Sequence, residues 1–224
     1  MLEPKSLINF LKQNEIDFYT GVPDSLLKDF CAYIEDEFHS NNHIVASNEG
    51  ASIGLAIGYH LSSGKVPLVY LQNSGLGNTI NPLLSLASPE VYSIPILLII
   101  GWRGEPGKKD EPQHIHQGRV TPALLTTMGI PYITIDSEMS KNDIFSRFGE
   151  QLNLCKSTNQ PVCILIKKGT FDSYQNKSKN SKHMKYKLER EKAVEIAVNE
   201  CEKNSVIVCT TGMLSRELFE FRAK

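Results

Sequence analysis

One carboxylate in this chain stands where an acidic side chain could exchange a proton with a bound molecule. Glu49 follows a short apolar strand pattern and begins a helix in which Gly50, Gly54 and Gly58 recur. Each interior glycine costs a helix roughly 0.5–1 kcal/mol relative to alanine, so three of them need another reason. Small residues allow a second backbone to approach closely. We therefore predict that Glu49 faces a ligand at a subunit interface, although a carboxylate in a first turn can also simply stabilise its helix.

Further polar residues come directly after other predicted strands. They lie in the segments 21–25, 72–74 and 101–103. In a parallel sheet the carboxyl ends of the strands meet at one edge, and ligands gather there. The candidate side chains at this edge are Asp24, Ser25, Asn73, Ser74 and Arg103.

A polar stretch, GWRGEPGKKDEPQHIHQGR, follows the apolar run 96–100 and is predicted to be a long loop. Loops of this length inside a compact domain are usually functional or disordered. Arg103 offers a planar fork for phosphate or carboxylate, and with Lys108 it could clamp an anionic substrate; a solvated charged loop is the simpler alternative. His114 and His116 are either site residues or exposed loop histidines. No carboxylate–histidine spacing completes a metal site around them.

The elements that must position these residues alternate regularly. Strands are predicted at 16–20, 43–47, 66–71, 96–100, 132–135 and 162–166, and helices at 4–14, 24–38, 50–62, 79–86, 121–128 and 141–155. Asp24 is the expected cap of the second helix, and Thr121 with Pro122 is the expected start of the fifth. Six alternations predict an α/β fold, a doubly wound parallel six-stranded sheet with helices on both faces.

Composition divides the chain of 224 residues and excludes several classes of protein. Residues 1–168 are predicted to form one domain, 169–188 a polar linker, and 189–224 the incomplete start of a second α/β domain with a strand at 206–209. A net charge of −1 argues against a nucleic-acid binder, and no aromatic residues interleave with the basic ones of the linker. No apolar run is long enough to cross a membrane, and the N-terminus has no signal-peptide pattern. Five cysteines without a C-x-x-C pair favour the cytoplasm.

The loop GLGNTI at 75–80 is an incomplete dinucleotide fingerprint, since Ile80 replaces the third glycine. A turn that needs positive φ is the alternative explanation of its glycines. The loop leaves open a nucleotide-dependent oxidoreductase with Arg103 near a 2′-phosphate.

Five segments taken together point to a family: GVPDS, ASNEGASIGLAIGYHL, LQNSGLGNTINPLLSL, GWRGEPGKKDEPQHIHQG and TTGMLSRELFE. In order and spacing they resemble the thiamine-diphosphate-dependent 2-oxo acid decarboxylases, and among these the phosphonopyruvate decarboxylases, which are close to the sulfopyruvate decarboxylases. The resemblance covers residues 1–168 as a pyrimidine-binding domain and resumes at Val206 as the start of a diphosphate-binding domain.

The resemblance implies that Glu49 shares a proton with the aminopyrimidine ring of thiamine diphosphate. The implied substrate is a small anionic 2-oxo acid, with 3-phosphonopyruvate converted to phosphonoacetaldehyde and carbon dioxide; sulfopyruvate is the alternative. Either Asp24 or Ser25 would contact it. The expected site has Glu49, Asp24 and His114 as catalytic residues, Glu49, Asn73 and Ser74 at the cofactor, and Ser25 and His116 at the substrate. On charge alone, we also expect Arg103 and either Lys108 or Lys109 to neutralise the anionic head group.

The family's magnesium and diphosphate ligands are expected outside this chain. The chain would then supply one half of an active site, completed by a second copy in a homo-oligomer or by a separate diphosphate-domain subunit. A non-catalytic oligomerising module is the alternative from another class.

Overall fold

The computed structural model describes residues 1–177, 187–202, 204–210 and 212–223. The chain divides into two compact units, Met1–Lys177 and Ser178–Lys224. Among the described residues, no helix is both long and apolar enough to cross a membrane.

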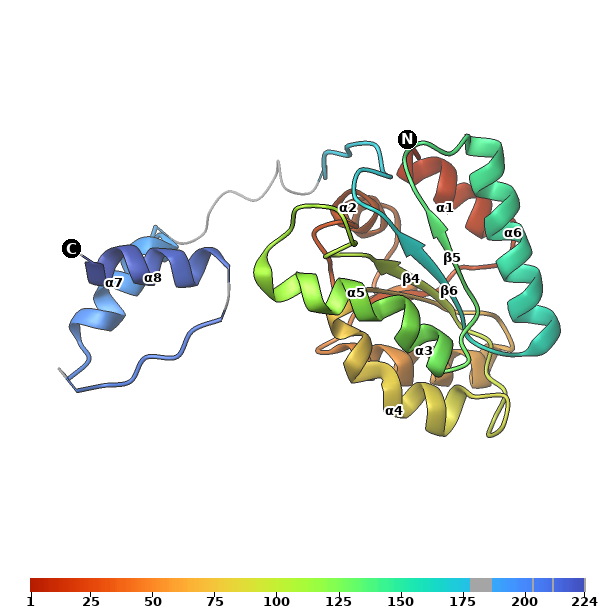
Figure 1. Ribbon diagram of the computed structural model, residues 1–224, viewed down its shortest axis with the longest axis horizontal. Coiled ribbons are helices and arrows are strands. Elements are labelled where there is room, and N and C mark those ends of the chain that lie inside the picture. The colour runs from red at the N-terminus through yellow and green to blue at the C-terminus, as the bar shows by residue number, and fades with distance from the viewer. Residues whose placement is uncertain (178–186, 203, 211, 224) are drawn as a thin grey trace. The chain divides into compact units, whose positions relative to one another are not determined.

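The first unit is built on a six-stranded sheet in which every neighbouring pair of strands is parallel (Figure 1). Its strands are β1 (Tyr19–Gly21), β2 (His43–Val45), β3 (Leu68–Gln72), β4 (Leu97–Gly101), β5 (Tyr132–Ile135) and β6 (Val162–Ile166). They lie in the order β2-β1-β3-β4-β6-β5. The predicted α/β class and its six parallel strands are confirmed.

The two faces of the sheet have separate hydrophobic cores because successive side chains of a strand point to opposite sides. In β4, Leu97 and Ile99 belong to one core, and Leu98 and Ile100 belong to the other. All four are fully buried. Strands buried on both faces read as continuous apolar runs, which is why 96–100 and 162–166 were recognisable in the sequence.

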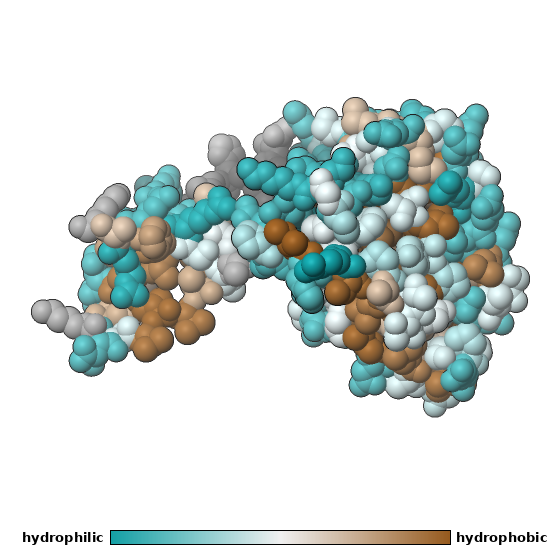
Figure 2. Space-filling view, in the orientation of Figure 1, coloured by the Kyte–Doolittle hydropathy of each residue, from teal (hydrophilic) through white to brown (hydrophobic). Residues whose placement is uncertain are grey.

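Helices cover both faces, as Figure 1 shows for α1 and α6 on one side and α4 and α5 on the other. The first face is covered by α1 (Pro4–Gln13), α2 (Lys28–Glu37) and α6 (Lys141–Thr158). The second is covered by α3 (Glu49–Ser63), the 3₁₀ helix η1 (Asn73–Thr79), α4 (Ile80–Pro82), the π-helical turn η2 (Leu83–Ala87) and α5 (Pro112–Thr127). Figure 2 shows hydrophobic side chains at the surface of this unit. The exposed hydrophobic residues of the second face include Leu84 of η2 and Ile115 and Val120 of α5.

The predicted start of α5 at Thr121 is wrong, because the helix begins nine residues earlier at Pro112. Pro122 lies inside it and cannot donate a hydrogen bond to the carbonyl of Gly118. The indole Nε1 of Trp102 donates to that carbonyl instead, at 2.8 Å. The replacement bond lets the helix continue through the proline, so the polar loop is shorter than predicted and His114 and His116 are helical.

Two other predicted helix starts differ from the structure. The N-cap position of α2 is Leu27, whereas the carboxylate of Asp24 accepts the backbone N–H of Leu26 in the preceding turn, at 3.1 Å. The predicted helix 79–86 is a succession of 3₁₀, α and π turns.

The first part of the predicted linker belongs to the first unit. Phe171 is 7% exposed and pairs with Leu2 in an isolated parallel bridge. The backbone N–H of Tyr174 donates to Asp29 on α2 at 2.9 Å. Residues 178–186 of the predicted linker lie outside the described part of the chain.

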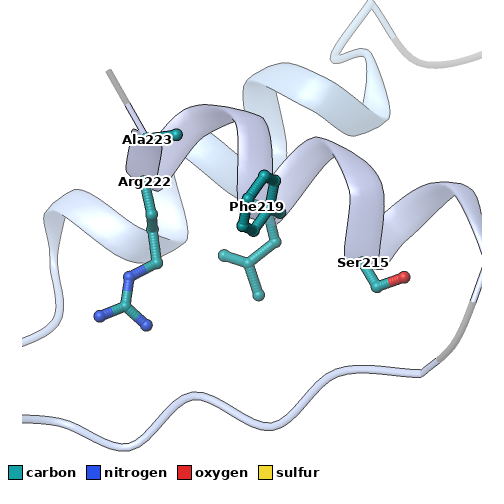
Figure 3. A pocket seen from close by; sticks show the side chains of 5 residues that line it. Ser215, Phe219, Arg222 and Ala223 are labelled. Atoms are coloured by element: carbon teal, nitrogen blue, oxygen red, sulfur yellow. The ribbon is translucent and has the colours of Figure 1, made fainter.

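The second unit contains α7 (Arg190–Asn199) and α8 (Met213–Ala223), joined by an ion pair between Arg190 and Glu217. The strand predicted at 206–209 does not form, and Val206 and Val208 are 90% and 89% exposed. A strand needs a neighbour, and the described residues of this unit contain none. A shallow hollow on α8 is lined by Ser215, Leu218, Phe219, Arg222 and Ala223 (Figure 3).

Replacing Leu98 by alanine tests the central strand. Leu98 is fully buried, so the variant should lose about 2–5 kcal/mol of unfolding free energy through lost burial and a cavity. Leu61→Ala is the matched control, because Leu61 is 70% exposed and its loss should change stability by less than about 0.5 kcal/mol. Urea unfolding followed by circular dichroism measures both. Equal losses would contradict the assignment of β4 to the core.

Candidate functional site

The site residues gather where the winding of the sheet reverses. From β1 the chain moves outward to β2 and then returns to β3 on the other side of β1. The segments that follow β1 and β3 therefore diverge, and in open parallel sheets this divergence is where ligands bind. Asp24 and Ser25 follow β1, Asn73 and Ser74 follow β3, and Arg103 follows β4.

Glu49 is the first residue of α3 and is half-buried. The preceding Asn48 caps the helix by accepting the N–H of Ala51 at 2.9 Å. The Oε2 atom of Glu49 accepts a hydrogen bond from Nδ2 of Asn78 at 2.8 Å. On its other side, a Cβ atom added to Gly75 would lie 2.2 Å from Oε1 of Glu49. The carboxylate is thus held between the start of α3 and η1.

The glycines of α3 and η1 have different reasons to be glycine. A Cβ on Gly50 would lie 2.8 Å from the carbonyl oxygen of Asn78, whereas Gly54 and Gly58 face open space. Among the described residues, the close approach predicted for the glycines of α3 is present only at Gly50. Gly75 does not have positive φ, so the explanation of its loop by a left-handed turn is wrong, and the contact with Glu49 accounts for it.

Asp24 is buried at the end of β1, with 4% of its surface exposed. Its Oδ2 atom accepts the N–H of Leu26, and a Cβ on Gly101 would lie 2.0 Å from that oxygen. Its Oδ1 atom has no hydrogen-bond partner among the described residues. Burial raises the pKa of this carboxyl, and the N–H of Leu26 and the charge of Arg103 oppose the rise only in part.

Arg103 lies half-buried at the start of the loop after β4, and both its backbone and its side chain are fixed. The amide of Asn73 accepts the N–H of Arg103 at 3.0 Å and donates to its carbonyl at 2.9 Å. The guanidinium pairs with Asp110 through two hydrogen bonds, and Nη1 donates to Oγ of Ser25 at 2.8 Å. Its positive charge is therefore directed at the Asp24–Ser25 turn.

His114 projects from the first turn of α5 toward the end of β3. Its Nδ1 atom lies 3.3 Å from Nε2 of Gln72, which also donates to Oγ of Ser74 at 2.7 Å. Partial burial lowers the pKa of His114, and the nearby charge of Arg103 lowers it further. The imidazole is therefore more readily neutral near pH 7 than a solvent-exposed histidine.

Two predicted substrate residues are not brought into this network. Lys108 and His116 are exposed, and the hydrogen bonds described for them stay within their own loop and helix. The sequence reasoning missed Asn78 and Asp110 as partners of Glu49 and Arg103. A polar residue in the strand-following loop was the only signal for Asn78, and Asp110 read as part of a solvated charged loop.

The chain matches known proteins along most of this unit. Residues 4–123 match the family model described as thiamine pyrophosphate enzyme, N-terminal TPP binding domain. The sulfopyruvate decarboxylase subunit alpha of Methanococcus maripaludis is 37% identical over 151 residues, covering 67% of this chain and 86% of that subunit. The phosphonopyruvate decarboxylase of Streptomyces viridochromogenes is 29% identical over 212 residues, covering 89% of this chain and 52% of that enzyme.

A solved structure agrees at the level of the fold. The benzoylformate decarboxylase of Polynucleobacter necessarius superposes with a TM-score of 0.54 at 16% identity, over 89% of this chain and 36% of that one. The parallel sheet and the polar residues at its switch point define a pyrimidine-domain unit of the thiamine-enzyme type. The chain belongs to the thiamine pyrophosphate enzymes, in the branch that includes the sulfopyruvate and phosphonopyruvate decarboxylases.

The described residues fit one end of the cofactor. Glu49 has a fixed carboxylate of the kind that can hydrogen-bond a ring nitrogen. Oδ1 of buried Asp24, which has no partner among the described residues, lies at the same end of the sheet. For the diphosphate and its metal ion, the described residues contain no group of three His, Cys, Asp or Glu side chains that could hold a metal.

Gly75→Ala tests the contact that holds Glu49. The added methyl group would overlap the carboxylate of Glu49 and displace it, so we expect a loss of about 1–3 kcal/mol in stability. Gly77→Ala is the matched control in the same helix, because no atom of the described residues lies within 4 Å of its Cβ position. Thermal unfolding of both variants is the measurement. If Gly77→Ala lost as much stability as Gly75→Ala, the loss would come from a general effect of alanine in η1 and not from the overlap with Glu49.

Asp24→Asn tests the raised pKa of Asp24. As the pH rises past the ordinary carboxyl range, the unfolded chain ionises at Asp24 while the folded chain keeps its proton, so wild-type stability falls until the folded pKa is passed. Asparagine cannot ionise, so its stability lacks this dependence on pH. Relative to the wild type, the unfolding free energy of the variant should therefore increase by about 1.4 kcal/mol for each unit by which the pKa is raised. Unfolding is measured from about pH 3, below the ordinary carboxyl range, to about pH 8. A difference that does not grow with pH would contradict the rise.

Proposed function

We propose that this chain is the pyrimidine-side half of a thiamine-diphosphate-dependent decarboxylase that acts on a small 2-oxo acid with an anionic head group. The observation that carries the proposal is the carboxylate of Glu49, held at the start of α3 by Asn78 and by the absence of a side chain at Gly75. A fixed, half-buried carboxylate can exchange a proton with a ring nitrogen without reorganisation.

In this proposal the cofactor supplies the nucleophilic carbon and the electron sink that decarboxylation needs. Glu49 holds and returns the proton at the aminopyrimidine ring, and Asn78 orients its carboxylate. We expected Asn73 and Ser74 beside the cofactor, and we propose that they support the site through other residues. Asn73 is 4% exposed, and its amide bonds the backbone of Arg103. The hydroxyl of Ser74 accepts a hydrogen bond from Gln72.

We assign the substrate to the side of the site formed by Asp24, Ser25, Arg103 and His114. Asp24 has a raised pKa and can hold a proton near the reacting carbonyl or carboxylate. His114, whose pKa is lowered, can accept one. Ser25 and Arg103 present a hydroxyl and a guanidinium to an anionic head group. Lys108 and His116 are left outside the proposed set, because their contacts stay within their own segments.

The head group is a phosphonate or a sulfonate. The sequence favoured 3-phosphonopyruvate, and the phosphonopyruvate decarboxylase relative aligns with 89% of this chain. Sulfopyruvate is supported by the higher identity of the alpha subunit of Methanococcus maripaludis, most of whose length is matched. Both acids carry a tetrahedral oxyanion on the methylene carbon, so the same donors would serve either.

We infer that a second polypeptide, or a second copy, completes the site with the diphosphate and magnesium half. The relatives named as alpha subunits support a separate partner. The exposed side of α3 offers a surface for it, because Gly54 and Gly58 leave open space beside the exposed side chains of Val45 and Leu55. Small residues there would let a partner backbone approach closely, as the sequence predicted.

Glu49→Gln tests the proposed function. With thiamine diphosphate, magnesium and the partner subunit present, kcat should fall by about 10²-fold or more, because glutamine cannot exchange the proton. The control is Glu90→Gln, since Glu90 is exposed in the turn after η2. Carbon dioxide release from 3-phosphonopyruvate and from sulfopyruvate is the assay. Undiminished turnover by the Glu49 variant would refute the assignment, and no turnover by the wild type with either acid would favour a non-catalytic module.

A further inference from the structure

We propose that Asp110 is a positioning residue that aims the guanidinium of Arg103 at a tetrahedral oxyanion, the phosphonate or sulfonate head group of the substrate. This inference rests on the proposed function and adds to it the residue on which head-group recognition depends. Asp110 would act through Arg103 and would not touch the substrate.

Asp110 is committed to its own loop by four hydrogen bonds. Its Oδ2 atom accepts from Nε of Arg103 and from the backbone N–H of Gly104, both at 2.8 Å. Its Oδ1 atom accepts from Nη2 of Arg103 and, at 2.8 Å, from the backbone N–H of Glu111. The bonds from Arg103 hold the pKa of Asp110 far below its usual range, so the carboxylate stays ionised at any working pH.

The two-point pairing fixes the plane of the guanidinium. Arg103 and Asp110 have side chains only 19% and 15% exposed, so water screens the pair weakly. With Nε and Nη2 held by Asp110, Nη1 points to Ser25 and donates to its Oγ at 2.8 Å. Ser25 directly follows the buried Asp24, so Nη1 of the guanidinium lies beside the turn that we assign to the substrate.

The unused donors suit a tetrahedral oxyanion. A guanidinium has five N–H groups. Within the described part of the chain, contacts with Asp110 and Ser25 use three of them, one each from Nε, Nη1 and Nη2. The remaining two lie on adjacent nitrogens, the arrangement that binds two oxygens of one phosphonate or sulfonate. The Arg103–Asp110 pair is neutral overall, so recognition would depend on the direction of these donors more than on net charge.

The loop has other anchors that do not involve Asp110. Asn73 bonds both backbone groups of Arg103, and Nζ of Lys167 forms an ion pair with Oε1 of Glu105 at 3.0 Å. A Cβ on Gly118 would lie 1.9 Å from the carbonyl oxygen of Gly104, so the loop packs directly on α5. We therefore expect the loop to stay folded when the Asp110 carboxylate is replaced.

The test is anion binding by the full chain, read from the fluorescence of Trp102. Trp102 is the one tryptophan in the sequence and precedes Arg103. Phosphonoacetate and sulfoacetate are the probes, with acetate as the probe that lacks a head group. In Asp110→Asn one carboxylate oxygen becomes an amide donor that faces the guanidinium, so affinity for the tetrahedral anions should fall about tenfold or more. Asp17→Asn is the control, since Asp17 pairs with Lys65 at the opposite end of β1.

A double-mutant cycle separates positioning from a merely structural role. If Asp110 acts through Arg103, Asp110→Asn should weaken binding in the wild type but not further in Arg103→Ala. Comparison of the two anions shows which head group the site prefers. Equal losses in both backgrounds, an unchanged affinity in Asp110→Asn, or a wild-type chain that binds neither anion would each overturn the proposal. Turnover by Glu49→Gln is measured in a separate experiment. A negative result in the anion-binding test therefore does not decide whether the chain belongs to a decarboxylase.

Discussion

The buried amide of Asn73 is the contact on which the arrangement of the site depends. It accepts the backbone N–H of Arg103 and donates both to the carbonyl of Arg103 and to Oγ of Thr121. These bonds join the end of β3, the loop after β4 and the middle of α5. Because the amide is 4% exposed, no water replaces a lost partner cheaply. The helix η1 therefore links the two parts of the site. Asn73 at its start holds Arg103, and Asn78 near its end holds Glu49.

The sheet could be predicted from the sequence because each central strand is buried on both faces. The run 162–166 matches the buried strand β6 residue for residue, and the run 132–135 matches the half-buried edge strand β5 equally well. The start of α5 could not be predicted, because Thr121 and Pro122 are residue types typical of a helix cap and a first helical position. The helix continues through Pro122 because the indole of Trp102, twenty positions before that proline, supplies a replacement hydrogen bond. The strand at 206–209 failed for a related reason: an apolar run becomes a strand only beside a neighbour.

The candidate site was recognisable where residue choice conflicts with local propensity. Glycine at position 50 weakens a helix, and the structure explains it by a close contact with the backbone of Asn78 that leaves no room for a side chain. Gly75 could not be interpreted in this way, because its reason is the carboxylate of Glu49, which is distant in sequence. The partners Asn78 and Asp110 were missed because ordinary polar loop residues carry no such conflict. The glycine-rich helix start singled out Glu49, the resemblance to a family suggested its role, and three-dimensional contacts identified what holds it.

Asp24 shows why such a site needs the large core behind it. Its Oδ1 atom is buried without a partner among the described residues, and a buried unpaired polar atom costs stability. Replacing Gly101 by any residue with a side chain would crowd the same carboxyl, so the neighbouring strand end keeps the space in which it lies. The two cores that cover the sheet offset this cost. A carboxyl with a raised pKa at Asp24, an ionised carboxylate at Asp110 and the guanidinium of Arg103 differ in how readily each holds a proton. Burial and hydrogen bonding, not residue type, set their different states.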